Sequence, residues 1–184
     1  MANTYNMVNL DKLQAIKAGN IVSVKWDGGK LQNGIPILLG ALVTGERELY
    51  YAMCTGATAP LAVTGGTTEA SVYLIANPEV MYEAGTMIDD WIATTGQAVR
   101  AYALYVSDEF ILSSGAYIGT AALNEYLHMV ATGAGTSTGV NLGMSQWACT
   151  AVFPPDYKTV AKCIELTTIG YDDNTAATFR VIKA

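Results

Sequence analysis

The single histidine of the chain, His128, is the residue best suited to acid–base chemistry near neutral pH. A Ser-His-Asp or Cys-His catalytic device depends on a histidine that takes the proton of the nucleophile. His128 stands in the middle of a segment, between Leu127 and Met129. We therefore interpret it as a strand histidine that faces solvent or is hydrogen-bonded within the fold. We expect no catalytic residue and no enzymatic activity.

Residues that could bind a metal are dispersed along the chain. Cys54, Cys149 and Cys163 include no close pair, so neither a disulfide framework nor a zinc site is expected, and we interpret them as buried, reduced thiols. Asp89 and Asp90 open a predicted helix, where acidic side chains suit the helix dipole. Residues 172–174 form a turn that lacks the spaced oxygen ligands of a calcium loop. We expect no metal ion.

Two glycine pairs, Gly28-Gly29 and Gly65-Gly66, lack the spacing of phosphate-binding loops and indicate turns instead. Paired carboxylates for glycoside cleavage come from distant positions, so sequence alone leaves them open. None of the sixteen acidic residues stands in a recognisable motif. We expect no cofactor.

Tyrosine is the commonest aromatic residue, with eleven copies. Tyr50 and Tyr51, together with Tyr102 and Tyr105, would supply rings for an exposed sugar-stacking face, and a glycan contact is kept as an alternative. Tyrosine is also typical of protein interfaces and half-buried sheets, and we prefer that interpretation.

The composition favours association with other protein chains. Only 14% of the 184 residues are charged, against roughly 25% in an average soluble domain. So few charges do not cover the surface of an ordinary monomer, and we expect a homo-oligomer or a subunit of an assembly. The net charge of −6 and the ten dispersed basic residues argue against nucleic acid, and we expect no nucleic-acid partner.

The first residues of the chain are polar and show no secretory signal. The longest apolar run, residues 35–43, is too short to span a bilayer and contains Pro36 and Gly40. We expect no membrane partner and a location in the cytosol, unless the chain leaves it inside a larger particle.

Hydrophobic periodicity predicts short elements. Residues 1–8 are interpreted as an N-terminal arm, and residues 9–184 as a single β-rich domain with two small lobes as the alternative. Residues 9–19 predict a short helix, with Leu10, Leu13 and Ile16 on one side and Gly19 at its end. A second short helix is predicted over residues 87–94.

Strands are predicted over most of the remaining chain. Residues 21–26 alternate in polarity, and strand-like runs recur at 48–53, 70–75, 99–106 and 110–112. Residues 124–131 fit a helix or a strand, and flanking glycines favour the strand. Residues 159–169 and 177–183 surround an Asp/Asn/Gly turn and predict a terminal hairpin. The fold class expected is mainly β with a minor α part: a compact antiparallel β-sandwich or barrel with one or two short helices.

Three stretches carry a resemblance to a known class of protein. They are Val72-Tyr73-Leu74-Ile75-Ala76-Asn77-Pro78-Glu79-Val80-Met81-Tyr82-Glu83, Ile88-Asp89-Asp90-Trp91 and Arg100-Ala101-Tyr102-Ala103-Leu104-Tyr105-Val106-Ser107-Asp108-Glu109-Phe110. In these stretches, about the central third of the chain, the sequence resembles small virion structural proteins of tailed bacteriophages, namely capsid decoration (head auxiliary or cement) proteins.

The resemblance implies a late virion protein that binds the major capsid protein lattice and stabilises the head. It implies no active site, so no residue role is carried over. A tail, neck or head-fibre component is the alternative within the virion, and a carbohydrate-binding module is the alternative outside it.

Overall fold

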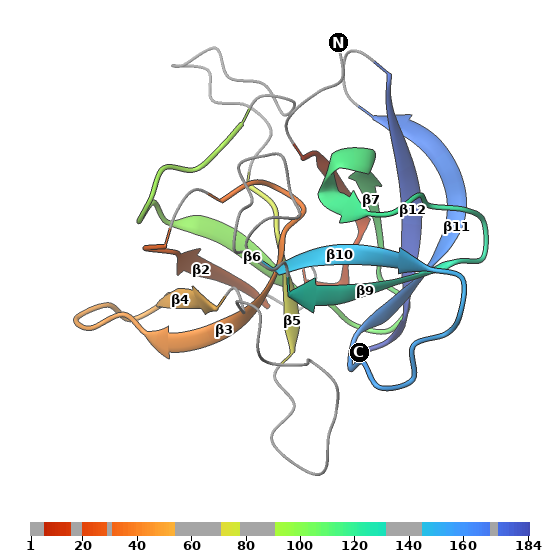
Figure 1. Ribbon diagram of the computed structural model, residues 1–184. Coiled ribbons are helices and arrows are strands. Elements are labelled where there is room, and N and C mark those ends of the chain that lie inside the picture. Colours follow the sequence, from red (N-terminus) through yellow and green to blue (C-terminus); the bar gives the residue numbers. More distant parts are fainter. Residues whose placement is uncertain are drawn as a thin grey trace.

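The computed structural model describes residues 6–15, 20–28, 31–53, 71–77, 91–131, 145–169 and 173–184. These residues form a mainly β structure in which two sheets pack as a compact, sandwich-like unit (Figure 1). The predicted fold class is thereby confirmed. The predicted sandwich and barrel are both present, because one of the two sheets is closed.

The larger sheet has seven strands in the order β1-β7-β12-β11-β9-β10-β8. Its strands are β1 (Val8–Lys12), β7 (Glu109–Ser113), β8 (Tyr117–Ile118), β9 (Tyr126–Ala131), β10 (Ser145–Thr150), β11 (Val160–Ile169) and β12 (Asn174–Lys183). Neighbouring strands are antiparallel except β8 and β10, which are parallel. The terminal hairpin predicted from the sequence is β11 and β12, and the ambiguous segment before residue 131 is strand β9, as predicted.

The smaller sheet is a closed five-stranded barrel in the order β2-β4-β3-β5-β6. Its strands are β2 (Ile21–Lys25), β3 (Pro36–Leu42), β4 (Leu49–Met53), β5 (Val72–Ile75) and β6 (Val99–Ala103). Strands β2 and β4 run parallel and every other pair is antiparallel. In Figure 1 the barrel strands lie on the left, and β7, β11 and β12 lie on the right.

Two hydrophobic clusters stabilise this arrangement. One fills the barrel and includes Val24, Ile37 and Ile75. The other packs the inner face of the seven-stranded sheet against outward-pointing residues of the barrel strands, with Phe110 and Leu74 among its fully buried members. Strand β5 serves both clusters because successive side chains of a strand point to opposite faces.

Neither predicted helix has its predicted extent among the described residues. Residues 9–12 belong to β1, which pairs with β7 through Asn9 opposite Ile111, and only Gln14 and Ala15 are helical. Strand pairing therefore overrides a weak local helix pattern. Residues 16–19 and 87–90 lie outside the described residues. Residues 91–94 are not helical, because Ala93 bridges Leu31 in the barrel core.

The start of the described chain is buried. Of the residues expected to form an arm, 1–5 lie outside the described part. Asn6 is 2% exposed and Met7 is 0% exposed, and Val8 begins β1. The backbone N–H of Met7 donates to the hydroxyl of Ser113 at 2.8 Å. Residues 6–8 are thus part of the main core.

Candidate functional site

His128 lies in β9 and is only 9% exposed, so the alternative in which it faces solvent is wrong. Its ring packs on Tyr157 with centroids 4.3 Å apart, and its Nδ1 atom is buried without a hydrogen-bond partner. Burial lowers the pKa of the imidazole, which keeps it neutral at physiological pH. Its contact with Tyr157 anchors the connection between β10 and β11 to the sheet.

A nucleophile pattern does occur near His128 in the sequence, at Gly135-Thr136-Ser137-Thr138-Gly139. In the hydrolases that use Gly-x-Ser-x-Gly, the serine stands on a turn from a strand into a helix. Here the pattern connects the antiparallel strands β9 and β10, and it lies outside the described residues. This context does not favour a nucleophile, and we give the match no catalytic role.

The cysteines are unreactive where the structure describes them. Cys149 and Cys163 are free thiols, Cys163 is buried, and Cys54 lies outside the described residues. Burial, followed by the nearby Glu125 and Cys163, raises the pKa of Cys149 to about 12. Burial likewise raises the pKa of Cys163. Both sulfurs are therefore protonated at neutral pH and behave as small apolar groups.

Acidic residues form no metal centre in the part of the chain that the structure describes, where no group of three or more His, Cys, Asp or Glu side chains could hold an ion. Asp89, Asp90 and Asp172 lie outside that part. Asp173 occupies the turn before β12 with a φ of 47°, a left-handed conformation typical of a turn aspartate.

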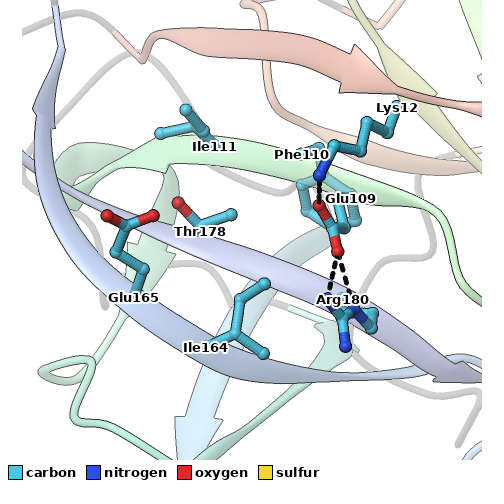
Figure 2. Close-up of a pocket in the computed structure, with 8 residues that line it drawn as sticks. All are labelled: Lys12, Glu109, Phe110, Ile111, Ile164, Glu165, Thr178 and Arg180. Carbon is cyan, nitrogen blue, oxygen red and sulfur yellow. Dashed lines mark hydrogen bonds and ion pairs between the residues drawn. The ribbon is translucent and has the colours of Figure 1, made fainter.

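A hollow of about 250 Å³ lies on the outer face of the seven-stranded sheet (Figure 2). Its lining comes from four neighbouring strands: Lys12, Glu109, Phe110, Ile111, Ile164, Glu165, Thr178 and Arg180. Figure 2 shows Glu109 between Lys12 and Arg180, with Glu165 away from this group. Because Glu109 is opposite Lys12 on one side and Arg180 on the other in the strand register, the sheet itself positions the three charges.

The carboxylate of Glu109 accepts hydrogen bonds from both cations. Lys12 Nζ lies 2.7 Å from Oε2, and Arg180 Nε and Nη2 lie 2.7 and 2.5 Å from Oε1. The bonds from Lys12 and Arg180 lower the pKa of Glu109, so it is ionised and unsuited to donate a proton. We interpret the group as a link between β1, β7 and β12.

Large apolar side chains are exposed at one end of the seven-stranded sheet. We define the apolar end surface as Ile118, Leu123, Val152 and Phe153, which are 43%, 56%, 75% and 41% exposed. Ile118 of β8 is opposite Ala148 of β10, and the Phe153 ring packs edge-on against Tyr126 at 5.4 Å. Ile118 therefore lies beside β10 and Phe153 beside β9, while Leu123 lies in the loop before β9 and Val152 in the loop after β10.

The loops that carry this surface are fixed by hydrogen bonds. In the loop before β9, Asn124 N–H donates to the Cys163 carbonyl at 3.0 Å, and Cys163 N–H donates to the Glu125 carbonyl at 2.8 Å. In the loop after β10, Lys183 Nζ donates to the Pro155 carbonyl at 2.7 Å. These bonds attach the backbone of both loops to β11 and β12, so the loops themselves need little ordering on binding.

The tyrosines selected from the sequence do not share one face. Tyr51 points away from the barrel core, with the Lys25 ammonium 5.0 Å from its ring, and Tyr102 is 8% exposed within the main core. Tyr50 packs against the barrel core instead, as does Tyr73, which the sequence reasoning did not select. The alternative in which Tyr50, Tyr51, Tyr102 and Tyr105 build one exposed face is therefore wrong.

Comparison with known protein families, curated proteins and solved structures gives no match to this chain. Among the described residues, no helix is long and apolar enough to cross a membrane.

Sequence reasoning also missed the apolar end surface. A signal was present at Val152-Phe153-Pro154-Pro155, where two large apolar residues directly precede a proline pair. Prolines favour a loop at this position, and apolar residues in a loop are often exposed.

Proposed function

We propose that this chain is a virion structural protein, a capsid decoration protein that binds the major capsid lattice of a tailed bacteriophage and stabilises the head. The apolar end surface is the observation that carries the proposal. Four large apolar side chains exposed on β8 and on the loops that flank β9 and β10 are typical of a surface that another protein covers.

The free energy available from this surface is modest for one copy. Burying one large apolar side chain completely contributes roughly 1.5–3 kcal/mol. Scaled by the exposed fractions of the four residues, their burial would contribute about 4 kcal/mol. A decoration protein binds at many equivalent sites, so a modest contribution per copy adds up over the whole shell. Any species that binds only the assembled shell stabilises it by mass action.

Two sequence features support the same function. The stretches that resemble decoration proteins cover β5, most of β6 and the start of β7, where the chain passes from the barrel to the seven-stranded sheet. The charge-poor composition, with 14% charged residues, suits a chain whose surface is partly covered by neighbours. We further propose that the chain is a homo-oligomer located in the virion after assembly in the host cytoplasm.

Electron microscopy of the parent particle tests this proposal. Density for this chain on the outside of the head, seated through the apolar end surface, is the expected result. The absence of such density would overturn it. Assembly of the purified chain into rings by sheet-to-sheet pairing would instead favour a tail component.

Binding to shells that lack the chain tests the surface itself. Leu123→Asp and Val152→Asp should each weaken binding at least tenfold, because a charge would be buried at the contact. Leu166→Asp is the matched control: Leu166 is 53% exposed on β11, outside this surface, and its variant should bind like the parent. Equal binding by all three variants would contradict the proposed contact.

A further inference from the structure

Two inward-pointing tyrosines lie at the same end of the barrel. Strands β4 and β5 are both antiparallel to β3, so they run in the same direction, and Tyr50 and Tyr73 are each the second residue of their strand. Each tyrosine alternates with a residue of the barrel core, Ala52 and Ile75 respectively. Ala52 is 5% and Ile75 is 0% exposed, whereas both tyrosines are partly exposed. The tyrosines therefore form the outermost layer of the barrel interior.

Two further polar side chains reach the same end. Strand β2 is parallel to β4, so it begins at this end of the barrel, directly after Asn20. Strand β6 is antiparallel to β2, so it ends at the same end, two residues before Tyr105. The side-chain amide of Asn20 donates to the hydroxyl of Tyr105. We name Asn20, Tyr50, Tyr73 and Tyr105 the tyrosine cluster.

The backbone fixes the positions of these residues. Ala103 N–H donates to the Asn20 carbonyl at 3.2 Å, which ties the start of β2 to the end of β6. Tyr105 N–H donates to the buried carboxylate of Asp108 at 2.9 Å. Tyr73 packs against the same core cluster as Tyr105 and against the same barrel core as Tyr50. Burial raises the pKa of Tyr73, and the neighbouring Tyr105 and Tyr50 raise it further.

We infer that the tyrosine cluster is a binding site for a neutral saccharide. A sugar ring presents C–H groups that pack on aromatic faces, and hydroxyls that both donate and accept hydrogen bonds. Tyrosine rings, their hydroxyls and one amide supply the matching groups, and the cluster contains no Asp, Glu, Lys or Arg. The mouth of a β-barrel is also a common place for small-molecule sites.

Titration of the purified full-length chain tests this inference. The probes are the neutral tetrasaccharides of glucose and of N-acetylglucosamine, followed by a glycan array, with affinities measured by calorimetry. Tyr73→Phe and Tyr105→Phe keep the ring and remove one hydroxyl each. Each should weaken binding about 3- to 10-fold, the effect of losing one ordinary hydrogen bond. The melting temperature of each variant reports whether the fold is kept.

Tyr51→Phe is the matched control, because Tyr51 points away from the barrel core and its variant should bind like the parent. A blank array together with no heat of binding at millimolar tetrasaccharide would overturn the inference. So would equal affinities for the parent, Tyr73→Phe and Tyr105→Phe. Since the isolated chain is used, these results are independent of whether it binds a capsid.

Discussion

Replacing Glu109 by glutamine would show how much the charged group on the outer sheet face contributes to stability. The change keeps the size of the side chain and removes its charge. The carboxylate is 10% exposed, whereas the side chains of Lys12 and Arg180 are 71% and 51% exposed. After the substitution, water can hydrate both cations where the carboxylate had bound them. The loss of free energy of unfolding should therefore lie between the loss for a surface ion pair and that for a buried one.

A surface ion pair contributes about 0–1 kcal/mol, and breaking a buried one costs about 3–5 kcal/mol. For Glu109→Gln we expect a loss of about 2 kcal/mol in the free energy of unfolding at pH 7. With a urea m value of about 2 kcal/mol/M, the unfolding midpoint should fall by about 1 M. Asp27→Asn is the matched control, because Asp27 lies 3.4 Å from Lys25 and its side chain is 55% exposed, against 10% for Glu109. It should change stability by less than about 0.5 kcal/mol.

The pH dependence provides a second measurement of the same group. The bonds from Lys12 and then Arg180 hold the pKa of Glu109 below its usual value of 4.5 in the folded chain. The unfolded chain therefore takes up the proton first as the pH falls. The stabilisation is complete above about pH 4.5 and is lost as the pH falls through the folded pKa. Glu109→Gln should flatten this part of the stability curve. An unchanged acid limb, or a loss below about 0.5 kcal/mol at pH 7, would refute the reasoning.

Three further outcomes are expected. Asp108→Ala should lower the free energy of unfolding by about 2 kcal/mol in urea, because two backbone N–H groups lose their acceptor. Gly34→Ala should lower the melting temperature more than Gly45→Ala does. Both glycines have a positive φ. A Cβ atom at Gly34 would lie 3.2 Å from the Leu112 side chain, whereas a Cβ atom at Gly45 would have no neighbouring atom within 4 Å. The thiol of Cys149 should react with a disulfide reagent far more slowly in the folded chain than in urea at pH 8, because its pKa is about 12; equal rates would contradict its burial.

The strands were predictable where local sequence and tertiary pairing agree. Alternating polarity indicated β2, and β-branched runs around an Asp/Asn turn indicated the β11–β12 hairpin. The helix predicted over residues 9–19 failed because its first residues pair with β7, about a hundred positions later in the chain. No local pattern contains that partner. The same long-range pairing sets the charged row of Lys12, Glu109 and Arg180, which sequence reasoning did not find.

The tyrosines show what the alternation of side chains along a strand predicts without knowledge of the strand pairing. Period-two alternation already requires Tyr50 and Tyr51 to point to opposite faces of β4, so a shared sugar-binding face could have been rejected from the sequence. Which of the two points into the barrel depends on β4 pairing with β2 and β3. That Tyr73 lies at the same end depends on β3 pairing with both β4 and β5. The tyrosine cluster thus follows from closure of the barrel. The sequence alone does not distinguish Tyr51 from Tyr50 as a ligand contact, whereas the structure places Tyr51 outside the cluster and so makes it the control.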